Sequence, residues 1–214
     1  MNHEIAVSIE PVSDNNQARL RGVIDYVHKQ SDLQVHKIGA IPFFPLERLV
    51  NWNGAGVICT TEKPECLDFV AKLKIPCVSV SLHQKPPASI STVHSDNEAI
   101  GKLAADHLLE IGLRKFAFVG HLNWLHNQER LSGFQNELRK KGVDCEIINV
   151  QFNKSKKWVW PSELQQRPLT EALRKLHKPV GLFAAHDEFA HDVIEKFKSL
   201  EIRIPDDAAV IGVN

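Results

Sequence analysis

Short apolar runs alternate with longer amphipathic stretches along the whole chain, and this alternation constrains the fold more than any other feature. Residues 5–9 form an apolar run of strand length, and residues 14–30 carry apolar side chains at helical spacing. Strands that alternate with helices form right-handed βαβ units and parallel sheets, so the sequence predicts an α/β fold. The expected strands are residues 5–9, 33–38, 55–59, 77–80, 116–119, 146–150, 180–184 and 208–213. The expected helices are residues 14–30, 45–50, 64–73, 97–111, 127–141, a helix with Pro168 at its first position, and 187–200.

A weak internal repeat divides this pattern into two halves. In residues 72–76 and again in residues 200–205, a helix ends, a proline blocks its continuation and a buried strand follows. We therefore predict two doubly wound parallel-sheet lobes, residues 1–92 and 93–214, which present the carboxyl ends of their strands to a common cleft. Asn214 directly follows an apolar strand, so we expect a C-terminally truncated domain whose chain should return to the first lobe.

Charge and composition exclude several classes of protein. The 214 residues contain 26 Lys and Arg against 26 Asp and Glu, which disfavours a stand-alone nucleic-acid binder because phosphate contacts need a cationic excess. No window approaches about 20 consecutive apolar residues, and no secretory signal is visible, so we expect a cytoplasmic protein without membrane contact. The four cysteines form no C-x-x-C pair and are expected to be free thiols.

Four ordered motifs resemble the sugar-sensing core of the LacI/GalR transcription regulators, and the closest resemblance is to xylose operon regulatory proteins. The motifs are residues 93–120, the R-x-x-G-F helix at 129–134, the loop at 178–187 and the strand at 204–214. The resemblance implies a fold like that of type I periplasmic binding proteins, with xylose or a similar aldose held between the lobes. It also implies a homodimer in the full protein, and DNA contact through an AraC-type helix-turn-helix domain outside this chain.

Two departures from the family pattern bear on which sugar is bound. Asn15 and Gln17 replace the tyrosine and arginine of the subfamily's Y-x-R motif, and His186 replaces the asparagine of its N-D loop. Asn15, His186 and Asn214 are nevertheless included in the expected ligand site.

Three charged residues are the candidate polar anchors for a sugar: Asp96, Arg130 and Asp187. A carboxylate accepts hydrogen bonds from hydroxyls, and a guanidinium donates to two oxygens in a fixed plane. Two structural alternatives stay open: Asp96 caps the following helix, and Arg130 is a solvated surface arginine. As a ligand anchor in a wet cleft, Arg130 is expected to contribute little to folding.

Trp124 and Trp158 are the candidate aromatic platforms, because an indole face stacks on the C–H side of a sugar ring. Packing within loops is the alternative, and it is favoured for one of the two residues Trp158 and Trp160.

The eleven histidines do not predict a metal centre. His186 and His191 are five positions apart, which directs them to different helix faces, and no third ligand is evident beside Asp187. His107 falls on the apolar stripe that contains Leu103 and is predicted to be a core histidine. No cofactor is expected, since the chain lacks nucleotide-binding glycine loops and the G-x-S-x-G motif of hydrolases.

The sequence therefore favours the ligand-sensing domain of a transcription regulator, without enzymatic activity. A periplasmic sugar-binding transport protein and an enzyme on a doubly wound fold remain the alternatives.

Overall fold

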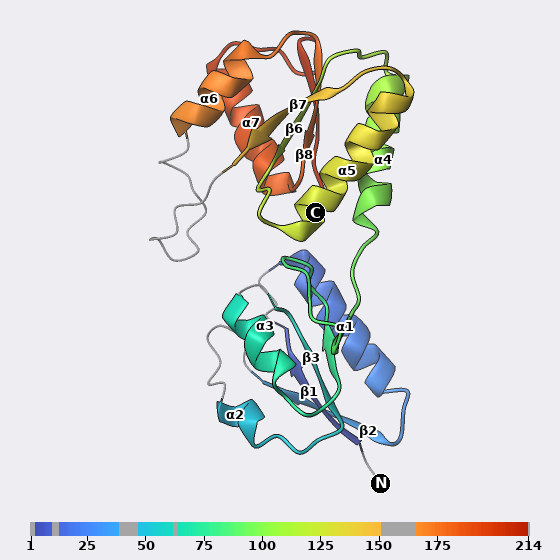
Figure 1. Ribbon diagram of the computed structural model, residues 1–214. Helices are drawn as coiled ribbons and strands as arrows, with labels where there is room; N and C mark the ends of the chain where they lie inside the picture. The colour runs from blue at the N-terminus through green and yellow to red at the C-terminus, as the bar shows by residue number, and fades with distance from the viewer. Residues whose placement is uncertain (1–2, 10–12, 39–46, 62–63, 151–165, 214) are drawn as a thin grey trace. The chain divides into compact units, whose positions relative to one another are not determined.

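The computed structural model describes residues 3–9, 13–38, 47–61, 64–150 and 166–213, and the chain divides into two compact units, Met1–Ser95 and Asp96–Asn214 (Figure 1). Each unit is an α/β structure around one parallel sheet, as the alternation of strands and helices predicts. No helix among these residues is long and apolar enough to cross a membrane.

The first unit contains a five-stranded sheet in the order β2-β1-β3-β4-β5, with every neighbouring pair parallel. Its strands are β1 (His3–Ser8), β2 (Leu33–Lys37), β3 (Gly56–Cys59), β4 (Cys77–Ser79) and β5 (Ile90–Thr92). Its helices are α1 (Asp14–Val27), α2 (Glu47–Val50) and α3 (Pro64–Ala71). The main core lies beneath α3, where Val57, Cys59 and Val70 are buried and Trp52 packs against them.

The second unit contains a four-stranded parallel sheet in the order β7-β6-β8-β9. Its strands are β6 (Phe116–Gly120), β7 (Cys145–Asn149), β8 (Val180–Ala184) and β9 (Ala208–Ile211). Its helices are α4 (Asn97–Glu110), α5 (Leu125–Lys140), α6 (Gln166–Lys175) and α7 (Asp187–Ser199). Helix α5 begins two residues earlier than predicted. Pro168 is the third residue of α6, whereas the sequence predicted it at the first position of that helix.

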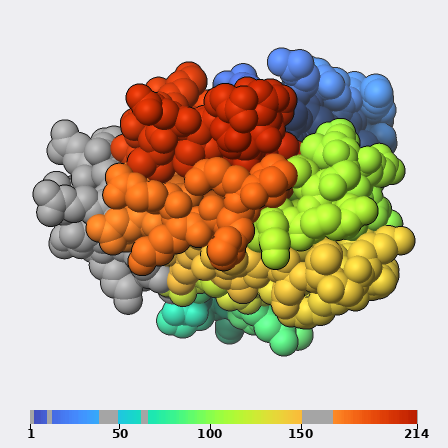
Figure 2. Space-filling view, turned by 90° about the horizontal axis from the view of Figure 1, so that it is seen from above, coloured from blue at the N-terminus to red at the C-terminus, as the bar shows by residue number. Residues whose placement is uncertain are grey.

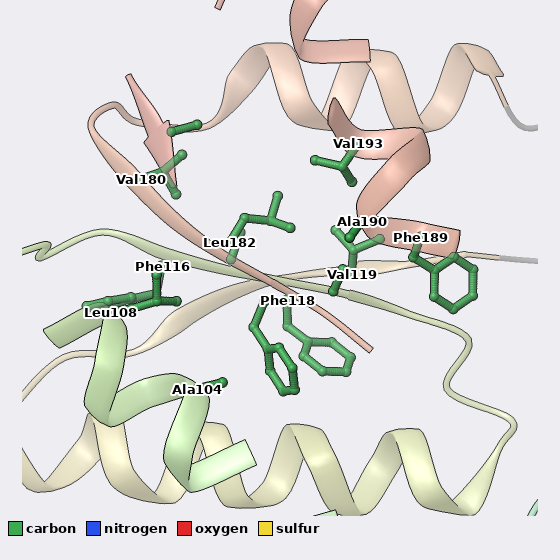
Figure 3. Packing of buried hydrophobic residues seen from close by; sticks show 14 of the residues in the cluster. Ala104, Leu108, Phe116, Phe118, Val119, Val180, Leu182, Phe189, Ala190 and Val193 are labelled. Carbon is green, nitrogen blue, oxygen red and sulfur yellow. The ribbon is translucent and has the colours of Figure 1, made fainter. Parts of the chain in front are cut away.

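The core of the second unit follows from the two-residue alternation of its central strands. Phe116 and Phe118 point from β6 towards α4 and α5, whereas Val119 points towards α7 (Figure 3). Phe118 packs edge-on against Phe183 of β8 at a centroid distance of 5.5 Å, and Phe183 lies 5.2 Å from Phe134 of α5. Each fully buried phenylalanine contributes roughly 1.5–3 kcal/mol, so this layer is a major source of stability for the unit.

Helices α4 and α5 approach each other closely because two glycines face the contact. A Cβ at Gly101 would lie 2.0 Å from the carbonyl oxygen of Arg130, and a Cβ at Gly133 would lie 2.0 Å from that of Glu98. Neither helix could come so near with any larger residue at these positions.

The prediction that His107 is a core histidine is wrong. Helix α4, part of the green surface in Figure 2, buries Ala104, Ala105 and Leu108. Leu103 and His107 are exposed. The apolar stripe of this helix is wider than the face that α5 and the sheet cover, so a residue on the stripe's edge stays at the surface.

All four cysteines are free thiols, as expected.

Candidate functional site

The carboxyl edge of the second sheet gathers polar and aromatic side chains from three connections. Strands β6, β8 and β9 are parallel, so the segments after Gly120, Ala184 and Ile211 emerge at the same edge. Helices α5 and α7 begin at this edge (Figure 1). This is the edge at which open α/β sheets bind ligands.

Arg130 of α5 forms hydrogen bonds to α4 and to this edge of the sheet. Its side chain is only 7% exposed, its Nε donates to Asn97 Oδ1 at 3.1 Å, and its Nη1 donates to the carbonyl oxygen of Ala185. Asn97 in turn donates from Nδ2 to Glu129 Oε2 at 2.9 Å. The guanidinium is thus fixed in position by hydrogen bonds to the start of α4 and the end of β8.

The alternative that Arg130 is a solvated surface arginine is therefore wrong. Removal of its side chain would leave the buried carbonyl of Ala185 and the amide oxygen of Asn97 without this donor, so we now expect a loss of stability.

An aromatic cluster of one indole and three imidazoles lies at the same edge. The Trp124 ring stacks on His126 at 5.6 Å and meets His121 and His186 edge-on at 4.9 and 5.7 Å. His126 Nε2 and His186 Nε2 are 2.9 Å apart and share a hydrogen bond. His121 is buried, and its Nδ1 is 2.7 Å from the carbonyl oxygen of Val150. These contacts hold Trp124 half-buried in a defined orientation, as a stacking platform requires.

Asp187 is exposed at the first turn of α7. Its backbone N–H donates to the carbonyl oxygen of Val213 at 2.9 Å, which joins α7 to the segment after β9. A Cβ at Gly212 would lie 2.2 Å from Asp187 Oδ1, so the glycine leaves room for this carboxylate. The arrangement places an exposed acceptor one residue from His186.

Asp96 performs the structural role that the sequence left open. It is the N-cap of α4, and its Oδ1 accepts from the backbone N–H of Ala99 at 2.9 Å. An N-cap carboxylate satisfies one of the unpaired donors at a helix start.

Three further expected site residues remain predictions. Asn15 is exposed on α1 of the first unit. Trp158 and Asn214 lie outside the described residues. Of the eight expected residues, Trp124, Arg130, His186 and Asp187 gather at one edge.

Sequence reasoning missed Asn97, His121 and His126. The histidines flank Trp124 in the segment after a buried strand, and this clustering of aromatic and imidazole residues was an available signal. Asp96 is exposed and the next residue, Asn97, is buried, and nothing in the sequence predicts this difference.

The first unit carries a neutral group of hydroxyls at the carboxyl edge of its own sheet. Thr61 Oγ1 and Ser79 Oγ are 2.7 Å apart, and the Thr61 N–H donates to Ser81 Oγ at 2.7 Å. All three residues are buried, and their hydroxyls bond to one another.

Comparisons with known proteins agree with this architecture. The chain is 26% identical over 166 residues to the HTH-type transcriptional repressor PurR of Photobacterium profundum, a match that covers 75% of this chain and 47% of that protein. It is 24% identical over 177 residues to the xylose operon regulatory protein of Escherichia coli K12, covering 79% of this chain and 44% of that protein. The chain thus spans less than half the length of either relative.

A solved structure described as the xylose-binding transcription activator XylR superposes on all of this chain and on 55% of its own, with 22% identity and a TM-score of 0.79. This likeness shows a common fold, which is the two-unit parallel-sheet architecture expected from the sequence. The model of the periplasmic binding protein-like domain matches residues 105–214, just over half of the chain. The chain belongs to the family of periplasmic binding protein-like domains.

Proposed function

We propose that this chain is the effector-sensing part of a transcription regulator and that it binds a pentose or similar aldose at the carboxyl edge of the second sheet. The observation that carries the proposal is the buried guanidinium of Arg130, fixed at an edge that also presents Trp124 and the exposed carboxylate of Asp187. A donor fork, an acceptor and an aromatic face are the groups that recognise a sugar ring.

The relatives support the regulatory part of this proposal, since both are transcription regulators and one is named for a xylose operon. Those proteins are about twice as long as the matched region, so we assign DNA binding to a helix-turn-helix domain outside these 214 residues. Homodimerisation is proposed for that full regulator and not for this chain alone. Sugar binding would act on DNA affinity by favouring one conformation of the sensor over another.

Calorimetric titration with D-xylose, D-ribose, L-arabinose and D-glucose tests the proposal. Asp187→Asn keeps the size of the side chain beside Gly212 but removes its charge, so it should weaken binding of the preferred sugar about tenfold, corresponding to roughly 1.5 kcal/mol for a charge-assisted hydrogen bond.

Lys196→Ala is the matched control on the same helix, because Lys196 lies in the last turn of α7, far from the sheet edge. It should bind like the wild type. Saturable binding of a purine base but of no sugar would instead assign the Trp124 platform to a flat aromatic ligand. No binding of any sugar, or equal affinities for wild type and Asp187→Asn, would refute the site.

A further inference from the structure

The hydrogen bond between His126 and His186 is a titratable link across the candidate site. The two Nε2 atoms are 2.9 Å apart, and the rings are nearly perpendicular, with an interplanar angle of 85°. His126 is the second residue of α5, and His186 immediately precedes α7. The link therefore joins the starting ends of two helices that lie on opposite faces of the sheet (Figure 1).

This contact limits how many protons the pair can carry. An imidazole nitrogen either donates or accepts, so one of the facing Nε2 atoms must carry a proton and the other must not. Adding one proton elsewhere on the pair gives it a single positive charge and leaves the hydrogen bond intact. Adding a second puts a proton on both facing nitrogens, which breaks the bond and sets two positive charges side by side.

The charged and titratable groups around the pair come from three directions. On α5, Arg130 bonds to the carbonyl of Ala185, the residue next to His186. On the connection after β6, His121 meets the other edge of Trp124. On α7, Asp187 adjoins His186 but is exposed, so water screens its attraction.

A bound ligand would change this balance. It would cover the half-buried His186 and remove water from the pair, which disfavours a charged imidazole. The fixed positive charge of Arg130 acts in the same direction, whereas the screened carboxylate opposes it weakly. Sugar binding and protonation of the pair should therefore compete.

We propose that the His126–His186 pair is part of the effector site, contacts the sugar only as an uncharged pair, and makes sugar binding release a proton. This inference rests on the proposed sugar site and adds His126 to it. Because an unperturbed imidazole titrates at about pH 6.5, the sugar affinity should change between about pH 8 and about pH 5.5. Affinity should be constant at the alkaline end and fall up to about tenfold per pH unit at the acid end.

Calorimetry of the wild-type protein with D-xylose and D-ribose across this pH range measures both predicted consequences. At about pH 6, the binding heat should depend on the ionisation enthalpy of the buffer, with up to about one proton released per sugar bound. His186→Asn retains a polar, uncharged side chain and removes one of the two imidazoles, so the fall in sugar affinity towards acid pH should be clearly smaller than in the wild type. His126→Gln should do the same, and its unfolding curve will show whether the buried substitution still folds.

His191→Asn is the matched control. His191 is an exposed histidine on α7, and its Nδ1 lies 4.0 Å from Asp192 Oδ1. The sugar affinity of His191→Asn should depend on pH as it does in the wild type.

Two outcomes distinguish this inference from the proposed function. Pentose binding that is independent of pH, or a pH dependence as steep in His186→Asn as in the wild type, overturns the proton link and leaves the sugar site standing. Failure of the wild type to bind any pentose at any pH overturns the proposed function, and the proton link with it.

Discussion

Even one added methyl group should destabilise the contact between α4 and α5. Gly101→Ala and Gly133→Ala each place a Cβ 2.0 Å from a backbone carbonyl oxygen of the other helix, whereas ordinary contacts of this kind lie at 3.4–4 Å. The obstructing atoms belong to helix backbones and cannot rotate away as a side chain would. The helices must therefore separate locally by more than an ångström.

The expected magnitude follows from two opposing effects. Overpacking of a tightly packed contact costs about 1–3 kcal/mol, whereas alanine is favoured over glycine in a helix interior by up to about 1 kcal/mol. Because a separation of more than an ångström places the overpacking cost near the upper end of its range, the net loss of stability should be about 2 kcal/mol for either variant. The double variant should lose less than the sum, because helices separated by one methyl group already accommodate part of the second.

Urea denaturation followed by circular dichroism measures these differences. Gly22→Ala is the matched control, since Gly22 lies within α1 with no atom close to its Cβ position. It should raise stability by roughly 0.5–1 kcal/mol. If Gly101→Ala and Gly133→Ala proved as stable as the wild type, the backbone approach described for α4 and α5 would be wrong.

Three further predictions concern single side chains. Asp96→Ala should lower stability by about 1 kcal/mol through loss of the α4 cap without changing sugar affinity, as denaturation and calorimetry would show; a loss of affinity alone would restore Asp96 as a ligand. The Arg203 guanidinium and backbone N–H donate to Asp207 and lower its pKa to about 2. Its contribution to stability should therefore be complete above about pH 4 and disappear as the pH falls through about 2, and Asp207→Asn should flatten this acid branch in urea titrations. Burial, followed by the neighbouring Cys77, raises the pKa of the Cys59 thiol to about 12, so a thiol reagent at about pH 8 should label Cys59 only after unfolding, as peptide mass mapping would detect.

The sequence predicted the layers of this fold well because buried strands and amphipathic helices carry distinct periodicities. It located helix ends less well. Helix α5 starts at Leu125, and Trp124 at its N-cap position makes no side-chain cap hydrogen bond. The sequence therefore contains no capping residue that marks this helix start. The exposure of His107 was missed for another reason: periodicity identifies a helix face, but how much of that face is covered depends on packing against elements that are distant in the sequence.

The candidate site was predictable to the level of the sheet edge and no further. Parallel strands bring the segments before Trp124 and His186 to one edge, and this follows from topology alone. The hydrogen bonds between those segments depend on side-chain rotamers and helix spacing, which leave no trace in the local sequence. Asn97 illustrates this, since its role arises only when α4 and α5 pack together.

The same packing would link the stability of the second unit to the proposed binding of a sugar. The carbonyl oxygen that Gly101 approaches belongs to Arg130, whose guanidinium is held by Asn97 and by the end of β8. A ligand that meets a fixed guanidinium does not have to order a flexible side chain, and ordering one costs about 0.5–1.5 kcal/mol. A methyl group at position 101 would move the backbone of Arg130 and shift the guanidinium away from this position. Stability and sugar affinity should therefore fall together in Gly101→Ala, although Gly101 has no polar group to offer a ligand.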